Sequence, residues 1–237
     1  MIPKQIFRAW QTQTFHKKVE KRIKKTIKIN QEYEHTIFTE PQRDDFVIAN
    51  FDKDIVDAYK KLNNVVAKVD LWRYLIIYKY GGVYLDMDAS IENPIKSFLN
   101  ENDKGLVSAE TNENLFLQWA LFYKKEHPII KKTIEFTIRN INENRYPNDI
   151  ANLTGPGVYT EALGYIHNQS QNKELKWKDV TKETNQEYII SKENSYRIFG
   201  IDFNGNLNFK IPESRYLYKD LEHWKTQQSK YDVLKND

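Results

Sequence analysis

The hydrophobic pattern is strongest in one stretch near the middle of the chain. Over residues 69–80, apolar and aromatic side chains recur at spacings of three and four, which predicts a helix with one apolar face. Two glycines follow at 81–82, and glycine readily adopts the left-handed backbone that ends many helices. Residues 83–85 are apolar or aromatic and predict a short buried strand, which leads into Asp86 and Asp88. Open α/β sheets bind ligands at the carboxyl ends of their strands, so this position favours a binding site.

The rest of the chain alternates between strand-like and helix-like patterns. Strands are predicted at 2–10, 33–39, 105–109, 196–203 and 207–211, the last two forming a hairpin around Asn204-Gly205. Helices are predicted at 15–29, 44–50, 52–62, 128–142 and 156–167. The strand–helix–strand alternation of the first part fits the nucleotide-binding half of an α/β fold.

Four charged side chains are concentrated around the central strand. Asp86 and Asp88 are separated by one residue, and a divalent cation held by both would relieve their repulsion. Carboxylate oxygens suit Mg²⁺ or Mn²⁺ rather than zinc. On the preceding helix, Asp70 and Arg73 are three residues apart and share a face. Arg makes forked contacts to phosphate and Asp accepts from sugar hydroxyls, so the group suits a phosphorylated, polyhydroxy ligand.

Each feature has a plainer interpretation when taken alone. An isolated D-x-D is more often a solvated turn, and Asp70 with Arg73 alone would be a surface ion pair of little energy. The combination of helix, glycines, strand and carboxylates favours the ligand site.

Composition narrows the function classes. The 237 residues suffice for a substantial core, and a net charge of +3 is too weak to indicate a nucleic-acid partner. The chain has no cysteine, which excludes disulfides and thiolate metal sites. The amino terminus lacks the apolar run of a signal peptide, and no stretch approaches the ~18 apolar residues of a membrane span. We therefore expect a cytoplasmic protein, with peripheral contact to an anionic membrane possible through the lysine-rich helix at 15–29.

The central stretch resembles the signature of glycosyltransferase family 32, which contains fungal initiating α-1,6-mannosyltransferases and is related to the clostridial glucosylating toxins. The family pattern is a helix with D-x-x-R, followed by Y-x-x-G-G-x-Y-x-D-x-D. It is matched without a gap by Asp70, Arg73, Tyr78, Gly81, Gly82, Tyr84, Asp86 and Asp88.

Three outer segments also resemble the family. The opening at 2–10 is similar to its first strand, although Phe7 and Arg8 replace a usual His-Gln. Residues 154–157 match its T-G-P-G segment. His223 and Trp224 align with the H-W of its closing motif, whereas Gln227 and Gln228 replace the final Ser-Trp.

This resemblance implies a fold and a reaction. The fold would be α/β of the GT-A type: a single domain over 1–237 with a Rossmann-like mixed sheet flanked by helices and a late β-hairpin. A nucleotide-sugar-binding half would extend to about residue 110, and an acceptor-side half with the C-terminal segment would occupy about 111–237. The reaction would move a hexose from GDP-mannose or a UDP-hexose to a glycan or other hydroxyl acceptor, with retention of anomeric configuration.

The resemblance also assigns roles to individual residues. Asp86 and Asp88 would hold Mn²⁺ or Mg²⁺, with His223 as a third metal contact. Asp86 would contact either the metal shell or the ribose of the donor. Asp70 and Arg73 would fix the hydroxyls of the donor sugar, and Arg73 would stabilise the departing diphosphate. Donor contacts would further include Tyr84 and Trp10, the latter stacking on the base; an ordinary core tryptophan and a surface histidine are equally good interpretations of Trp10 and His223.

Two other function classes remain open at this point. A catalytically degenerate protein on the same fold would bind a nucleotide-sugar or carbohydrate, but it would be expected to lose the four charged residues, which are intact. A metal-dependent phosphoesterase built on the Asp pair would need more convergent carboxylates and histidines than the sequence offers. The chain also lacks a P-loop, a G-x-G-x-x-G fingerprint and a G-x-S-x-G elbow.

Overall fold

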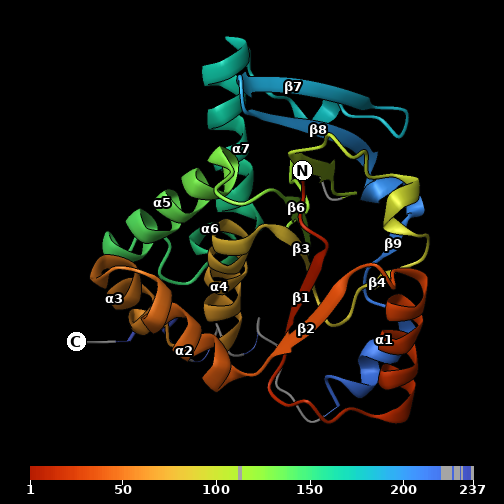
Figure 1. The fold of residues 1–237 in the computed structure, drawn as a ribbon. Coiled ribbons are helices and arrows are strands. Elements are labelled where there is room, and N and C mark those ends of the chain that lie inside the picture. Colours follow the sequence, from red (N-terminus) through yellow and green to blue (C-terminus); the bar gives the residue numbers. More distant parts are fainter. Residues whose placement is uncertain (112–113, 220–225, 227–229, 231, 236–237) are drawn as a thin grey trace.

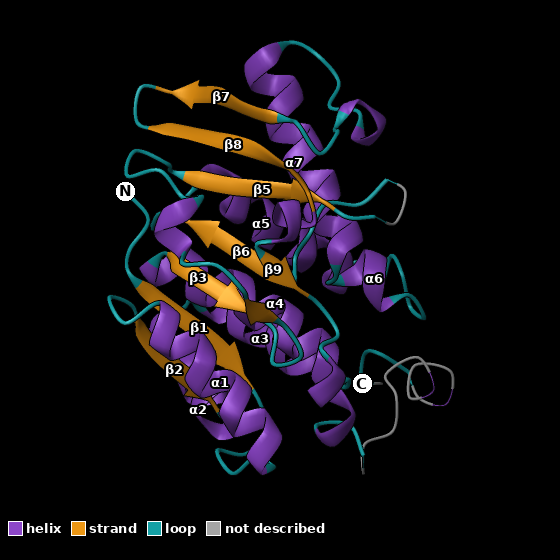
Figure 2. Ribbon diagram, turned by 90° about the vertical axis from the view of Figure 1, so that its right-hand side faces the viewer, coloured by secondary structure: helices purple, strands orange, loops and turns teal. Residues whose placement is uncertain are grey.

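A seven-stranded mixed sheet forms the centre of the molecule (Figure 2). The computed structural model describes residues 1–111, 114–219, 226, 230 and 232–235. The strand order is β2-β1-β3-β6-β5-β8-β7. The strands are β1 (Gln5–Ala9), β2 (Glu34–Phe38), β3 (Gly82–Leu85), β5 (Gly105–Ala109), β6 (Ala120–Tyr123), β7 (Asn185–Ser191) and β8 (Asn194–Ile201). A second, two-stranded sheet pairs β4 (Ser90–Ile91) with β9 (Leu207–Asn208).

Helices cover both faces of the large sheet (Figure 1). On one face lie α2 (Glu40–Asn50), α3 (Lys53–Lys61), α4 (Val65–Tyr80), α5 (Pro128–Asn142), α6 (Ile150–Leu153) and α7 (Pro156–Gln171). On the other face lie α1 (Lys17–Ile29) and the small β4–β9 sheet. Short 3-10 helices occupy Ile95–Ser97 (η1), Trp177–Asp179 (η2), Asp202–Gly205 (η3) and Pro212–Tyr216 (η4). In the part of the chain that the structure describes, no helix combines the length and the apolar character needed to cross a bilayer.

The sheet separates two hydrophobic clusters. The larger includes α4, α5 and α7, and the smaller lies under β4 and η1. The prediction that α4 has only one apolar face is wrong in its centre, where every residue from Asp70 to Ile77 is buried. Because α4 lies between the sheet and α5, its polar side chains in this stretch must find partners inside the protein.

Three parallel strands end at the same edge of the sheet. β1 pairs in parallel with both β2 and β3, so their carboxyl ends lie together. Gly81 caps α4 with a φ of 69°, and Gly82 begins β3 with a φ of 100°. A Cβ on Gly82 would lie 2.7 Å from the carbonyl oxygen of Gln5, so this strand can approach β1 only with glycine here. The two glycines thus bring the residues after β3 to the carboxyl edge.

The late hairpin exists, but the prediction placed it wrongly. Residues 196–203 and 207–211 do not pair with each other: β8 pairs with β7, and β9 pairs with β4. The Asn204-Gly205 dipeptide lies in η3, where Asp202, Phe203 and Asn204 also have positive φ. The residues expected to form one arm of a hairpin instead cross to the other side of the sheet. The short helix α6 lies in the interval 144–154, for which the sequence pattern predicts neither a helix nor a strand.

Candidate active site

The residues after β3 form a tight turn. The backbone N–H of Asp86 donates to Trp119, and the N–H of Ala89 donates to the carbonyl of Asp86. The carbonyl of Asp88 accepts from the N–H of Ile211, at 3.0 Å. The turn is therefore held on one side by the main sheet and on the other by the segment that follows β9.

One ionic cluster joins α4 to this turn. The Arg73 guanidinium Nη2 lies 2.9 Å from Asp70 Oδ1 and 3.3 Å from Asp86 Oδ1. The Tyr84 hydroxyl donates to Asp86 Oδ1 at 2.5 Å, and its ring lies 4.7 Å from the Arg73 guanidinium carbon. Burial lowers the pKa of Arg73, but the negative charges of Asp86 and Asp70 outweigh it and leave that pKa above its ordinary value. Arg73 is thus a permanent cation that ties the two carboxylates together.

Asp70 lies at the base of the cluster, only 2% exposed. The amide of Gln118 donates to its Oδ1 and the hydroxyl of Thr154 to its Oδ2, each at 3.1 Å. Burial raises the pKa of Asp70, and Arg73 with these two donors offsets that effect only in part. Thr154 belongs to the T-G-P-G segment noted in the sequence, whereas nothing in the sequence pattern marked Gln118.

Asp88 follows two residues after Asp86 in the same turn. It is buried, at 6% exposure, and its carboxylate interacts with the hydroxyl of Tyr218. Burial and the neighbouring Asp86 raise its pKa from 3.8 to about 6. The interaction with Tyr218 and the positive charge of Lys210 act in the other direction. Two carboxylates with different surroundings therefore lie two residues apart.

Arg8 is a residue of the site that sequence reasoning missed. Its guanidinium Nη1 donates to the carbonyls of Asp86 at 2.8 Å and Ala89 at 3.2 Å, so it spans the turn from β1. Burial lowers the pKa of Arg8 to about 10, against the opposing charges of Tyr84, Asp86 and Asp88. A charged side chain within an apolar strand was the available signal.

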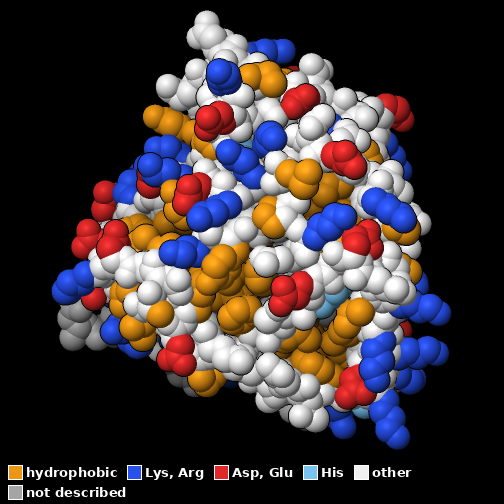
Figure 3. Space-filling model, in the orientation of Figure 1, with side chains coloured by type: hydrophobic (Ala, Val, Ile, Leu, Met, Phe, Trp, Pro, Cys, Tyr) orange, Lys and Arg blue, Asp and Glu red, His pale blue; other side chains and the backbone are white. Residues whose placement is uncertain are grey.

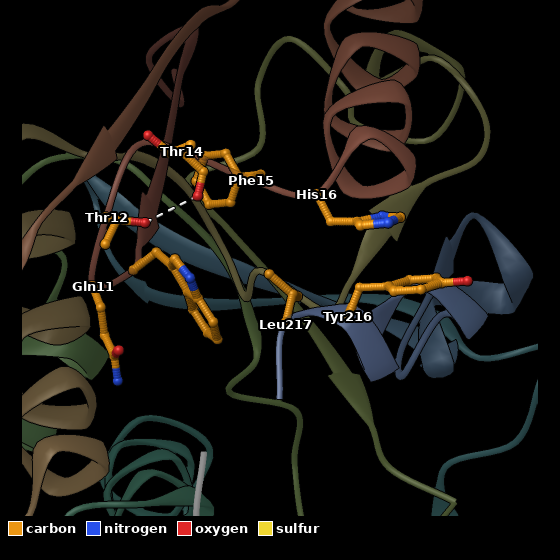
Figure 4. A pocket seen from close by; sticks show the side chains of 8 residues that line it. Gln11, Thr12, Thr14, Phe15, His16, Tyr216 and Leu217 are labelled. Atoms are coloured by element: carbon orange, nitrogen blue, oxygen red, sulfur yellow. Dashed lines mark hydrogen bonds between the residues drawn. The ribbon is translucent and has the colours of Figure 1, made fainter. Parts of the chain in front are cut away.

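Trp10 lies at the end of β1 beside a small pocket (Figure 4). Trp10 is partly exposed, and its ring meets the edge of Tyr218 at a centroid distance of 5.6 Å. His16 and Tyr216 stack in parallel 4.1 Å apart on the far side of the pocket. The pocket is lined by Trp10, Gln11, Thr12, Thr14, Phe15, His16, Tyr216 and Leu217. Pockets that hold whole drug-sized ligands measure roughly 300–1,000 Å³, and this one, at about 230 Å³, has room for one planar group.

The carboxylate oxygens of the turn are suitable ligands for a hard divalent cation. Among the residues that the structure describes, no group of three or more His, Cys, Asp or Glu could hold a metal. His223, the predicted third contact, lies outside the described residues. Mg²⁺ and Mn²⁺ commonly use one or two protein carboxylates and take their other oxygens from phosphates and water. Asp86 and Asp88 are sufficient for that kind of site.

The fold and the position of the aspartates define the class. A mixed sheet with helices on both faces and a D-x-D at the carboxyl end of β3 is the arrangement expected of a GT-A fold. The solved structure "PaToxG Glycosyltransferase" has a similar fold, with a TM-score of 0.56 over 72% of each chain and 20% sequence identity. The predicted fold class is therefore confirmed.

The sequence comparison identifies the family resemblance. Residues 16–104 match the family described as "Glycosyltransferase sugar-binding region containing DXD motif". This match confirms the resemblance to DXD glycosyltransferases inferred from the motifs.

Individual relatives are distant. The chain is 26% identical to "Initiation-specific alpha-1,6-mannosyltransferase" of Candida albicans, over 73% of this chain and 56% of that protein. It is 23% identical to "Mannosyl phosphorylinositol ceramide synthase CSH1" of Saccharomyces cerevisiae, over 89% of this chain and 57% of that protein. The matched regions thus span little more than half the length of these two relatives.

Proposed function

We propose that this protein is a metal-dependent hexosyltransferase that uses a nucleotide-diphospho-sugar. The observation that carries this proposal is the continuous cluster Asp70–Arg73–Asp86, with Asp88 beside it, at the carboxyl edge of the sheet. A phosphoesterase has less support, because the described residues offer no third acidic or histidine ligand beside the aspartate pair.

The charged side chains at the site would have separate roles in binding and orienting the donor. Asp88 and Asp86 would hold Mn²⁺ or Mg²⁺, which supplies charge stabilisation for the diphosphate when bound. Arg73 keeps Asp86 oriented through its ion pair, and its fixed positive charge lies close to where the diphosphate would develop negative charge. Asp70, anchored by Gln118 and Thr154, would contribute to the floor under the donor sugar and fix its orientation.

We propose retention of anomeric configuration by attack on the face of the leaving group. Both carboxylate oxygens of Asp70 already have partners: Gln118 and Arg73 contact Oδ1, and Thr154 donates to Oδ2. Because the side chain is also buried, Asp70 is poorly suited to be a covalent nucleophile. The bond from the anomeric carbon to the diphosphate would break as the acceptor oxygen bonds to that carbon, and the acceptor proton would pass to a diphosphate oxygen. Detection of a glycosyl-enzyme adduct by mass spectrometry would refute this route.

The names of the relatives guide the choice of donor. Several are mannosyltransferases, so GDP-mannose is the first donor to test, followed by UDP-hexoses. The acceptor would be a hydroxyl group of a glycan or of another molecule. Domain organisation and cellular location stay predictions.

The basic helix α1 would support peripheral contact with an anionic membrane. Lys and Arg side chains gather over α1 at the lower right of Figure 3. Six lysines there are exposed: Lys17, Lys18, Lys21, Lys24, Lys25 and Lys28. Arg22 is less available, since it pairs with Glu92 and Glu213. Salt-sensitive co-sedimentation with phosphatidylserine vesicles, lost when Lys21, Lys24 and Lys28 become Gln, would support this contact.

The deciding experiment measures donor binding and donor hydrolysis. The protein would be screened with Mn²⁺ against GDP-mannose, UDP-glucose, UDP-galactose and UDP-N-acetylglucosamine, using thermal shift and slow release of nucleotide. One donor should raise Tm and be hydrolysed, and Asp88→Ala should lose both responses. Binding without hydrolysis or transfer would favour the degenerate binding protein, and the absence of any response would contradict both.

A further inference from the structure

The segment 209–218 crosses the aspartate turn. β9 pairs with β4, which directly follows the turn, with Ser90 opposite Asn208. The ring of Phe209 stacks on Trp119 at 5.0 Å, and the N–H of Ile211 bonds the carbonyl of Asp88. The left-handed backbone of Lys210, with a φ of 52°, lies between these two attachments. The base of the segment is therefore fixed beside Asp88.

The end of the segment is fixed beside the Trp10 pocket. Leu217 packs with Met87 and Val19 in a small hydrophobic cluster. Tyr216 stacks on His16, and its hydroxyl accepts from the Lys18 ammonium. Figure 1 shows η4, in blue, lying beside α1. These contacts hold the segment over both the turn and the pocket without making it part of the main sheet.

Tyr218 contacts the residues that are predicted to bind the two ends of the nucleotide part of the donor. Its ring meets Trp10, the predicted base contact, and its hydroxyl interacts with Asp88, the predicted metal ligand. In a nucleotide-diphospho-sugar, the ribose and the first phosphate lie between base and metal. A side chain that touches both Trp10 and Asp88 therefore lies beside that part of the donor.

We propose that residues 209–218 form the outer wall of the donor site, in which Lys210 pairs with the diphosphate and Tyr218 covers the ribose. This inference rests on the proposed function and adds two binding residues to it. Lys210 is exposed, and its charge acts on Asp88, so it can reach an anion held at the turn. A mobile ammonium group beside a diphosphate adds charge-assisted hydrogen bonds that the two aspartates cannot supply.

The test compares ligands of different length on matched variants. Calorimetry with Mn²⁺ would measure GDP, GMP and guanosine, or UDP, UMP and uridine if the donor screen selects uridine nucleotides. Lys210→Gln should lower the affinity for the nucleoside diphosphate by about tenfold and leave the affinity for the nucleoside unchanged. Tyr218→Ala should weaken all three ligands, whereas Tyr218→Phe should keep most of the nucleoside affinity because the ring remains.

Lys219→Gln is the matched control, because Lys219 is an exposed lysine that directly follows the segment 209–218. If Lys219→Gln weakens binding of the diphosphate as much as Lys210→Gln does, the effect comes from the overall positive charge near the site. The specific role of Lys210 is then overturned. If both Lys210→Gln and Tyr218→Ala bind like the native protein while Asp88→Asn does not, the wall is overturned and the proposed function stands. If the native protein binds no nucleotide, both fail. A Tm no more than about 2 °C below that of the native protein, a loss of roughly 1 kcal/mol or less for a chain of this size, confirms that each variant is folded.

Discussion

At the residue scale, Asp88 places ligand binding in conflict with stability. Its carboxylate is buried, and its pKa is raised to about 6 by burial and by Asp86. A carboxyl whose pKa is higher in the folded than in the unfolded state binds more protons when folded between those values. Its contribution to stability is present below pH 4 and is lost as pH rises through about 6.

Asp88→Asn should therefore stabilise the protein while abolishing donor binding. The variant removes the cost of burying a charge, and we expect Tm in EDTA at pH 8 to rise by about 5 °C. At pH 5 the gain should be smaller, because the native carboxyl is then largely protonated. Differential scanning calorimetry at both pH values checks this, with exposed Asp54→Asn as the control. An equal gain at both pH values would contradict the electrostatic cause.

Arg73 shows the opposite behaviour, because its environment favours its charge. Arg73→Met leaves Asp70 and Asp86 without their shared cation, and loss of one partner of a buried ion pair costs about 3–5 kcal/mol. Urea unfolding at pH 7.5 should show this loss. The exposed Arg145, which lies 3.6 Å from Glu143, provides the control: Arg145→Met should cost less than about 1 kcal/mol.

A double variant tests the cause of the Arg73 effect. Adding Asp70→Asn to Arg73→Met removes the uncompensated buried charge and should recover a substantial part of the lost stability. Additive losses in the double variant would mean that the two side chains act independently, contrary to the geometry.

At the element scale, the approach of β3 to β1 depends on one glycine. A Cβ at Gly82 would lie 2.7 Å from the Gln5 carbonyl oxygen, and a φ of 100° is strained for any L side chain. Gly82→Ala should lower the free energy of unfolding by about 2 kcal/mol or more and weaken donor binding, because Asp86 would shift with the strand. Gly164→Ala is the control: Gly164 lies inside α7 with open space around its Cβ position, so alanine should be neutral or stabilising by up to about 1 kcal/mol. Equal losses in the two variants would contradict the close approach as the cause.

The elements around β3 could be predicted from sequence because their patterns are local. The cap at Gly81, the strand at 83–85 and the helix at 128–142 follow from glycine, apolar spacing and an N-terminal proline, and all are observed. β7 was not predicted because this edge strand is largely exposed and contains no fully buried side chain. Asn204-Gly205 was misread because its left-handed backbone serves η3, and only distant pairing with β4 decides where the chain goes next.

In the candidate site, too, only the residues within one local stretch could be predicted from the sequence. The motif Asp70, Arg73, Asp86 and Asp88 could be predicted because its spacing is contained in one stretch, and the structure brings the first three into one ionic cluster. Arg8, Gln118 and Tyr218 reach the site from far along the chain. Their contacts depend on strand order and on the course of the segment after β9, which no local pattern encodes.

At the scale of the whole molecule, the predicted halves are interleaved in one sheet. β6, from the second half, lies between β3 and β5 of the first half, and β5 also pairs with β8. Both hydrophobic clusters likewise contain residues from before and after position 110. We therefore propose that the two halves are functional regions of one cooperative unit rather than separate folding units.

A fragment of residues 1–110 should consequently not fold alone. Without β6 and β8, β3 loses one of its two neighbouring strands and β5 loses both of its neighbours, and α4 loses its packing against α5. The fragment should show no cooperative urea transition by circular dichroism, whereas the full chain should unfold in one transition with coincident fluorescence and circular dichroism curves. The slope of that transition should match the surface exposed by the entire chain rather than by half of it. A cooperative transition in the fragment, or two separated transitions in the full chain, would show that the nucleotide-binding half is a domain of its own.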